Sequence, residues 1–379
     1  MVWLVKLAFT RRPPLATLSQ ARLPPVRWPS KAVEPNSPRR PLSIMPVDPT
    51  PVLQYINGFR FSKVMFAAVE LGVFDRLDKQ PRSAEELAAD LKCEPTAMNR
   101  LLDGLVGMQL LARESQTYRN TDLASELLTT TSPNRMTGYI KFSNDVSWKL
   151  WSHFENAIRE GSHRWKDAYG WDQPIFSSFF ADEAAMREFL MGMHGYGVIS
   201  SPKVVRAVDL SPFKHLVDLG GATGHLPIAA CEAYESLTAT VFDLPDVIPL
   251  TKEIVAQSSV ADRIDVTAGD FFADELPEAD LMSLGRILHD WSDEKIDRLL
   301  AKIFDRLPEG GGLLLAEILI QDDRGGPDWG QMQDLNMLVC TEGRERTLAE
   351  YEAILRRAGF SSVTGQVTGA PVDAVLAIK

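Results

Sequence analysis

The sequence is short of cysteines and of long apolar runs, and each shortage excludes a class of protein. Its three cysteines, Cys93, Cys231 and Cys340, are widely spaced and form no CxxC pair. A disulfide framework and a thiolate zinc site are therefore not expected, and a reducing compartment such as the cytoplasm fits best. No apolar run approaches the ~18–20 residues that a membrane-spanning helix needs, so we expect no membrane partner.

What the sequence does contain is the composition of a folded globular protein. Hydrophobic residues make up 45% of the chain and charged residues 24%, which excludes a disordered, collagen-like or coiled-coil chain. At about 100–200 residues per domain, a length of 379 residues indicates two domains. The formal net charge of −11 disfavours a nucleic-acid partner, because phosphate binding needs clustered cations.

Residues 1–45 depart from this composition. They carry eight basic residues against a single acid, Glu34, and such a start can be a mitochondrial transit peptide. Eight prolines between Pro13 and Pro41 would break the amphipathic helix that such a peptide needs. We therefore expect a disordered leader, or a start codon placed too early with Met45 as the real beginning, and keep mitochondrial targeting as the alternative.

Residues 46–200 are predicted to form a mostly α-helical winged-helix domain followed by an aromatic-rich helical linker. Apolar spacing and capping signals predict helices over residues 51–77, from Ser83 onward and over 96–108, then short strands over 110–113 and 117–121. The helix over 96–108 offers only Asn99 and Arg100 to a DNA groove and is otherwise mainly apolar. We therefore expect this domain to pair two copies of the chain as a homodimer rather than to bind nucleic acid.

Residues 139–196 hold 13 of the 32 aromatic side chains in the sequence. They are Tyr139, Phe142, Trp148, Trp151, Phe154, Trp165, Tyr169, Trp171, Phe176, Phe179, Phe180, Phe189 and Tyr196. Most are expected in the core, which is the usual position of an aromatic stripe. Such a local excess is also what a pocket for a flat apolar substrate requires, so both interpretations stay open.

From residue 201 to residue 379, short apolar strands alternate with helices. The pattern predicts strands over residues 215–219, 239–243, 264–267, 280–284, 312–317 and 374–378, and helices over 295–307 and 348–358. This alternation predicts an α/β domain with a Rossmann-like, doubly wound parallel sheet. The last strand is expected at the edge of the sheet, in antiparallel orientation.

Ligands of such sheets bind at the carboxyl ends of the strands, where the residues form an ordered set. The first strand ends in the segment 217–224, where Gly220 lets the backbone approach a ligand, although the spacing departs from the GxGxxG of dinucleotide sites. The second strand ends at Asp243, a carboxylate suited to a ribose diol. The third leads to residues 269–271, a carboxylate beside an aromatic edge for adenine. In this order they indicate an adenosyl ligand without a pyrophosphate.

The fourth strand is followed by His289, one of only six histidines in the chain. An unperturbed imidazole titrates at about 6.5, which suits it to accept a hydroxyl proton at neutral pH. Glu317, which ends the fifth strand, and Glu345 are placed to orient His289 or touch an acceptor; the alternative is surface pairing with nearby arginines. Asn336 and Cys340 are four apart on a predicted helix and so share one face, which lines a pocket or is an ordinary half-buried surface.

These motifs resemble those of the class I S-adenosylmethionine-dependent O-methyltransferases of the caffeate and hydroxyindole type. The motifs are Asp-Leu-Gly-Gly-x-x-Gly, Phe-Asp-Leu-Pro, Gly-Asp-Phe-Phe, Arg-x-Leu-His-Asp-Trp and Glu-Gly-x-Glu-Arg-Thr. Together with the winged helix they cover the chain after residue 45. The sequence is most similar to the acetylserotonin O-methyltransferase group, through residues 335–339 and 341–347.

The resemblance implies S-adenosylmethionine as the methyl donor and assigns roles to particular residues. The cofactor contacts would be Gly220, Asp243, Gly269, Asp270, Phe271 and Arg286. His289 would be the base, paired with Glu317 and Glu345. The acceptor would be touched by Asp290 and Asn336, and Cys340 stands where the acetylserotonin enzymes carry a glutamine that faces the substrate. This departure leaves the acceptor itself undetermined.

The sequence thus predicts methyl transfer from S-adenosylmethionine to a hydroxyl of a small aromatic acceptor, a hydroxyindole or a phenol, by in-line displacement. No metal is expected, because the carboxylates are spread over separate strand ends without ligand spacing. Two alternatives remain. A protein of the same fold without transferase activity would not be expected to keep His289, and a regulator that senses S-adenosylmethionine and binds DNA is disfavoured by the apolar helix over 96–108.

Overall fold

The computed structural model describes residues 47–170 and 183–379, and the chain divides into two units, residues 1–53 and 54–379. Of the first unit only residues 47–53 are described, and they include the start of helix α1. The leader predicted over 1–45 and the aromatic residues Trp171, Phe176, Phe179 and Phe180 lie outside the described residues. Over the described part of the chain, every helix is too short or too polar to cross a membrane.

Residues 50–127 form helices and a small antiparallel sheet. The helices are α1 (Thr50–Glu70), α2 (Val73–Lys79), α3 (Ala84–Asp90), α4 (Pro95–Gly107) and α5 (Asp122–Leu127). The strands are β1 (Arg82–Ser83), β2 (Leu111–Glu114) and β3 (Thr117–Asn120), in the order β1-β3-β2. The two helices and the hairpin predicted between residues 83 and 121 are therefore confirmed.

One predicted element in this region is wrong, because residues 51–77 form two helices rather than one. Gly72 has a φ of 74°, a left-handed conformation that interrupts the helix between α1 and α2. The predicted helix start at Ser83 is confirmed as a capping box. The Ser83 hydroxyl accepts from the Glu86 N–H at 3.3 Å, and the Glu86 carboxylate accepts from the Ser83 N–H at 2.7 Å.

The described residues of the aromatic-rich region, 139–170 and 183–196, lie in a succession of helices, as predicted. They are α6 (Thr137–Phe142), the π-helical η1 (Ser143–Ser147), α7 (Trp148–Trp151), α8 (Phe154–Glu160), α9 (Trp165–Tyr169) and α11 (Glu183–Ala207). Two glycines let α6 and α11 pack backbone to backbone, since a Cβ on Gly138 would lie 2.7 Å from the Gly192 nitrogen. The predicted domain boundary at residue 200 falls inside the continuous helix α11.

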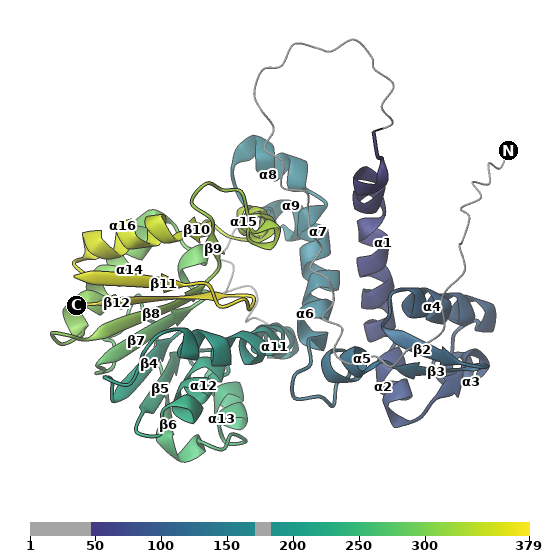
Figure 1. Cartoon of the computed structure of the whole chain (residues 1–379), viewed down its shortest axis with the longest axis horizontal. Helices are drawn as coiled ribbons and strands as arrows, with labels where there is room; N and C mark the ends of the chain where they lie inside the picture. The colour runs from purple at the N-terminus through teal and green to yellow at the C-terminus, as the bar shows by residue number, and fades with distance from the viewer. Residues whose placement is uncertain (1–46, 171–182) are drawn as a thin grey trace, which may run out of the picture. The chain divides into compact units, whose positions relative to one another are not determined.

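Residues 208–379 form a seven-stranded mixed sheet flanked by helices (Figure 1). Its strands are β4 (His215–Leu219), β5 (Thr238–Asp243), β6 (Ile264–Ala268), β7 (Leu281–Gly285), β8 (Gly312–Glu317), β11 (Ser362–Gln366) and β12 (Asp373–Ile378). The order is β11-β12-β8-β7-β4-β5-β6, with β4 to β8 parallel. Since β4 lies between β5 and β7, the strand order reverses beside β4, and the ligand crevice of such a sheet opens at that point.

The end of the chain departs from its prediction. Strand β12 is antiparallel to β8, as expected, but it is not the edge of the sheet, because β11 pairs with its other side. The sequence of β11 gave no signal, since its residues alternate between half-buried and exposed without an apolar run. An edge strand that packs only lightly on the core does not need one.

The two faces of the sheet carry separate cores. Helices α12 (His225–Ala233), α13 (Ile248–Val255) and the end of α11 cover one face, and α14 (Asp293–Arg306) and α16 (Leu348–Ala358) cover the other (Figure 1). Alternate residues of β4 point to opposite cores, Leu216 to the first and Val217 to the second. The remaining elements are the 3₁₀ turns η2 (Ala261–Arg263) and η3 (Leu288–Asp290), the helix α15 (Asp328–Cys340) and the parallel pair β9 (Leu319–Ile320) and β10 (Arg346–Thr347).

Candidate active site

A cavity of ≈ 370 Å³ opens at the carboxyl ends of β4 and β7 and extends to the helices α6, α9, α11 and α15. Ten of the twelve residues selected from the sequence line it: Gly220, Asp243, Gly269, Asp270, Phe271, Arg286, His289, Asp290, Asn336 and Cys340. The other two, Glu317 and Glu345, are fully buried behind His289. We call the part formed by residues 218–222, 243–244 and 269–272 the sheet side, and the part formed by α6, α9 and α15 the helix side.

The sheet side begins where β4 ends. Gly220 has a φ of 70°, and a Cβ there would lie 2.7 Å from the Ile287 Cδ1, so a side chain would fill the space in front of the strand. The Asp243 carboxylate accepts the N–H of Ala222 and the N–H of Leu244, both at 2.7 Å. Asp243 therefore ties the loop after β4 to the end of β5 while remaining part of the cavity wall.

Burial sets the electrostatics of this side. It raises the pKa of Asp243 to about 6, although its two backbone hydrogen bonds counteract the shift. A second carboxylate, Asp218, is 2% exposed and accepts the Ser283 hydroxyl at 2.5 Å across the β4–β7 pair. Burial raises the pKa of Asp218 to about 7. Asp218 was not among the residues predicted for the site, although a carboxylate within the apolar strand 215–219 is a signal that could have identified it.

The loop after β6 forms the outer wall of the sheet side. Gly269 cannot carry a side chain, because its Cβ would lie 2.2 Å from the Phe242 Cζ. Asp270 shapes the next turn by accepting the Phe272 N–H at 2.8 Å. The rings of Phe271 and Phe272 meet edge to face, with centroids 4.8 Å apart. Glycine, carboxylate and aromatic edge thus adjoin as predicted.

Arg286 follows β7 in the left-handed region, with a φ of 56° that is uncommon for a residue with a side chain. Its guanidinium lies over the Tyr196 ring, 5.0 Å from the centroid. Its Nε and Nη1 are buried without a hydrogen-bond partner among the described residues. Two unsatisfied donors on a cation in the cavity wall are suited to an anionic or carbonyl group of a ligand.

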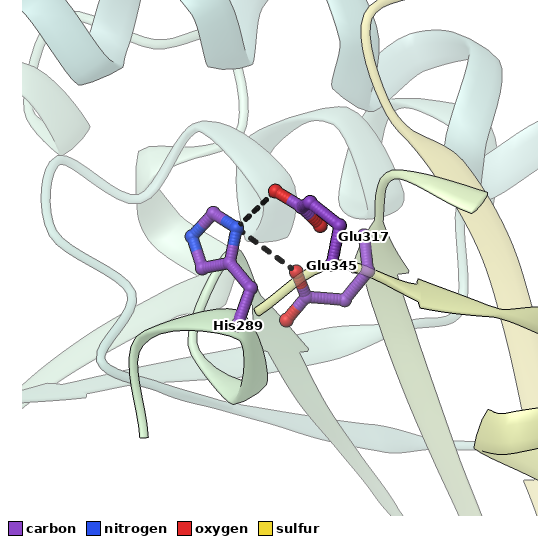
Figure 2. Close-up of side chains that lie close together, drawn as sticks. All are labelled: His289, Glu317 and Glu345. Atoms are coloured by element: carbon purple, nitrogen blue, oxygen red, sulfur yellow. Dashed lines mark hydrogen bonds and ion pairs between the residues drawn. The ribbon is translucent and has the colours of Figure 1, made fainter. Parts of the chain in front are cut away.

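His289 lies in η3, where Glu317 holds the turn in place. One oxygen of Glu317 accepts the backbone N–H of Ile287 at 3.0 Å and that of Leu288 at 2.8 Å. These are donors that the start of a short helix leaves unsatisfied. The other Glu317 oxygen lies 3.7 Å from the His289 Nδ1. Glu317 therefore both supports the turn and faces the imidazole (Figure 2).

Glu345 reaches the same imidazole from a distant part of the chain. Its Oε1 lies 2.7 Å from the His289 Nδ1, a hydrogen bond between fully buried groups (Figure 2). The pairing of β10 with β9 brings this segment beside the residues that follow Glu317. Gly343 allows the close approach, because a Cβ there would lie 2.3 Å from the His289 carbonyl oxygen. The buried Arg346 adds a further tie by donating to the Leu288 carbonyl at 3.3 Å.

The charges around His289 determine its protonation. Burial alone would lower the pKa of His289, but the carboxylates of Glu345 and Glu317 outweigh it and raise the pKa to about 9. Burial raises the pKa of Glu317 to about 7, although the positive charge of His289 counteracts this rise. Burial also raises the pKa of Asp290, whose Oδ1 lies 3.7 Å from the His289 Nε2. The imidazole is thus hydrogen-bonded at Nδ1, whereas its Nε2, beside Asp290, makes no hydrogen bond to the described residues.

The same three side chains place ligand atoms within 4.8 Å of one another, close enough to hold a metal ion. Two features favour hydrogen bonding instead. The Nδ1–Oε1 distance of 2.7 Å is that of a charge-assisted hydrogen bond, and one Glu317 oxygen is already held by two backbone N–H groups.

The helix side of the cavity contains aromatic rings and the residues on α15. Tyr139, Phe142 and Trp165 line it, and Phe189 on α11 lines the cavity next to Phe142, with ring centroids 5.2 Å apart, so part of the aromatic excess does border the cavity. The Trp165 Nε1 donates to the Cys340 carbonyl at 2.7 Å, and the Trp151 Nε1 donates to the Asn336 Oδ1 at 2.9 Å. The helix predicted to carry Asn336 and Cys340 on one face is confirmed as α15. The two indole contacts were not predicted, because they join positions 175 and 185 residues apart.

Comparison with known proteins identifies the family. A sequence model described as the O-methyltransferase domain matches residues 151–361, more than half of the chain. A second model, described as the O-methyltransferase dimerisation domain, matches residues 53–130. The chain belongs to the O-methyltransferase family.

Individual relatives agree with this assignment. Acetylserotonin O-methyltransferase of Gallus gallus is 41% identical over 338 residues, which cover 87% of this chain and 97% of that protein. The crystal structure of human N-acetylserotonin methyltransferase in complex with S-adenosylmethionine superposes with a TM-score of 0.83, at 38% identity, and covers 89% of this chain and 99% of that one. The mitomycin 7-O-methyltransferase MmcR, at 26% identity, has a TM-score of 0.76 over 87% of this chain and 97% of its own.

Several predictions made from the sequence are thereby confirmed. The chain is an S-adenosylmethionine-dependent O-methyltransferase, with a Rossmann-like catalytic domain and an N-terminal helical dimerisation domain. S-adenosylmethionine is its methyl donor. The relatives have differently named substrates, so membership of the family does not by itself identify the acceptor.

Proposed function

We propose that this O-methyltransferase methylates the hydroxyl of a small aromatic acceptor, a hydroxyindole of the N-acetylserotonin kind or a related phenol, with His289 as the general base. The observation that carries the proposal is the geometry of His289. Its Nδ1 is hydrogen-bonded to Glu345 at 2.7 Å, while the residue itself lines the cavity. The similarity to acetylserotonin O-methyltransferases favours the hydroxyindole among aromatic acceptors.

The sheet side fits the donor. S-adenosylmethionine supplies an electrophilic methyl group on a sulfonium sulfur when bound. In the proposal, Asp243 accepts hydrogen bonds from the ribose hydroxyls. Residues 269–271 border the adenine, and Gly220 leaves the space in which the ligand meets the backbone. The unsatisfied Arg286 donors would bind a carboxylate, which the amino-acid portion of the donor carries.

His289 and its two carboxylates then handle the acceptor proton. When Nδ1 carries a hydrogen and donates it to Glu345, Nε2 keeps its lone pair and can accept the hydroxyl proton. The developing imidazolium is stabilised by Glu345 and Glu317, as the hydroxyl oxygen becomes the nucleophile. Asp290 and Asn336 would hold the acceptor so that this oxygen is directed at the methyl group, and positioning supplies much of the acceleration. This proposed reaction uses no metal.

The raised pKa of His289 has a consequence for the reaction. Below a pH of about 9 the imidazole is largely protonated before ligands bind, so the rate should rise with pH across the neutral range. A cationic donor bound nearby disfavours the imidazolium and moves the pKa of His289 downward. Donor binding would therefore prepare the base.

We further propose the domain arrangement and assembly. Residues 46–200 would form a winged-helix dimerisation unit with its helical linker, residues 201–379 the catalytic domain, and residues 1–45 a leader.

Ile56, Phe59 and Phe61 on α1 are each more than half exposed, and a second copy would cover them. Light scattering should report about twice the 42.1 kDa chain mass, and a clean monomer would contradict the homodimer. The eight prolines between Pro13 and Pro41 favour a cytoplasmic location over a mitochondrial one, because they would break the amphipathic helix of a transit peptide.

The acceptor is tested with labelled S-adenosylmethionine and a panel of hydroxyindoles, catechols and flavonoids. The proposal expects label on the oxygen of at least one aromatic hydroxyl, with the hydroxyindoles among the best acceptors. Transfer to nitrogen only, or to none of the aromatic hydroxyls, would contradict it.

A further inference from the structure

Asn336 on the helix side has its amide orientation fixed by the protein. Its Oδ1 lies 2.9 Å from the Trp151 Nε1. An indole N–H can only donate, so the atom facing it must be the amide oxygen and not the amide nitrogen. The terminal NH₂ of Asn336 therefore lies on the other branch of the amide.

A second donor occupies the same oxygen. The Cys340 Sγ lies 3.6 Å from the Asn336 Oδ1, one turn further along α15. Burial raises the pKa of the Cys340 thiol to about 12, so the thiol keeps its hydrogen and acts as a weak donor. Both lone pairs of the Asn336 oxygen are thus occupied, and the NH₂ is the part of the side chain for which the described residues show no protein partner.

Trp151 is itself held firmly in place. Its ring stacks on Phe154, with centroids 5.0 Å apart and planes 17° from parallel, and packs against the cluster that contains Leu150, Trp165 and Cys340. The indole reaches α15 from α7, a helix of the aromatic-rich region.

From this network we infer that Trp151 is a positioning residue. By holding the Asn336 Oδ1, it directs the Asn336 NH₂ toward the acceptor as a hydrogen-bond donor. The inference rests on the proposed function and sharpens its substrate class. Besides its hydroxyl, the acceptor should carry a group that accepts a hydrogen bond, such as an amide carbonyl on a side arm. An acceptor with an apolar arm of the same length would leave the Asn336 NH₂ unpaired.

The test compares two acceptors that differ only in the arm: N-acetylserotonin, and a 5-hydroxyindole whose arm is an alkyl chain of equal length. Trp151→Phe keeps an aromatic ring that can stack on Phe154 but removes the indole N–H. KM for the amide acceptor should rise roughly 3–10-fold, the effect of losing about one neutral hydrogen bond. KM for the alkyl acceptor, KM for S-adenosylmethionine and the pH profile should stay within about twofold of wild type. Trp148→Phe is the matched control, since Trp148 lies in the same helix, is 37% exposed and packs on Phe66.

Two further variants separate positioning from mere packing. In an Asn336→Ala background, adding Trp151→Phe should change the ratio of the two KM values by less than about twofold, because no side-chain amide is left for Trp151 to orient. Asn336→Asp keeps an oxygen for Trp151 but presents a second oxygen in place of the NH₂, so it should penalise the amide acceptor more than the alkyl one. This variant tests the inference even if Trp151→Phe folds poorly.

Equal increases of both KM values in Trp151→Phe, or equal penalties in Asn336→Asp, would overturn the inference and leave the proposed function intact. Failure of the wild-type enzyme to methylate either hydroxyindole would overturn the inference, and the proposed function fails with it only if no aromatic hydroxyl of the wider panel is labelled.

Discussion

The sheet side of the cavity is made by loops that follow consecutive strands, whereas the helix side is made by helices from separate parts of the chain. Asp243 on the sheet side bonds to Ala222 and Leu244, which belong to the neighbouring strand end and to its own loop. On the helix side, the bond that orients Asn336 comes from Trp151, 185 residues earlier. One side is assembled by the topology of a single sheet and the other by packing between regions.

This difference matches two tasks. In the proposed function the sheet side holds the donor, and that side consists of backbone turns with little room for change, as the 2.2 Å contact of a Cβ at Gly269 shows. In the same proposal the helix side holds the acceptor, and that side consists of side chains on helices, which can be exchanged without altering the sheet. His289 lies where the two sides meet.

The largest effect is expected at that junction. His289→Gln should lower turnover by about 10²–10⁴-fold, the usual contribution of a positioned base. The affinity for S-adenosylmethionine should change less than about threefold, because the Asp243 and Gly269 regions are untouched. Calorimetry for the donor and initial rates for the acceptor measure the two quantities. A variant that binds the donor poorly would show that His289 supports the sheet side instead.

The second effect should be confined to the sheet side. Asp243→Ala should weaken binding of S-adenosylhomocysteine by roughly 1.5–3 kcal/mol, the range for hydrogen bonds to a charged group. Asp246→Ala is the matched control, because Asp246 is an exposed acid on the same loop. Calorimetry on both folded variants measures the difference. Unchanged affinity in Asp243→Ala would remove Asp243 from the donor site.

A smaller effect concerns pH. Removing the charge of Glu345 in Glu345→Gln takes away a major cause that raises the pKa of His289. The pKa then falls, so the acid limb of the pH profile of kcat/KM should move to lower pH, by roughly 1–2 units. Glu342→Gln serves as the control, since Glu342 lies in the same loop but pairs with Lys295 at 2.7 Å near the surface. An acid limb that stays in place in Glu345→Gln would mean that another group titrates.

The comparison also explains what the sequence could and could not predict. The carboxyl ends of parallel strands meet at one edge of a sheet, so the alternation of strands and helices was sufficient to bring Gly220, Asp243 and Asp270 together. Cys340 and Asn336 were predictable as neighbours because four residues form one turn of a helix. These are local or topological rules that a pattern of residue types can express.

The missed features depend on packing between distant segments. Trp151 and Trp165 are two of many aromatic residues in their region, and nothing in the spacing distinguishes them as donors to α15. The edge strand β11 lacks an apolar run, because it has little core to cover. The break at Gly72 was missed because apolar spacing continues across it, although the glycine itself was a signal.

The most direct test of the account is the dependence of rate on acceptor acidity in wild type and in His289→Gln. The acceptors should share one ring system and have hydroxyl pKa values from roughly 7 to 10, the upper end being that of an ordinary phenol. A general base matters most for the least acidic hydroxyl, so the loss in His289→Gln should be largest at a pKa of about 10 and should shrink steadily toward 7. A loss of equal size for every acceptor would contradict the role of His289 as the base, however inactive the variant is.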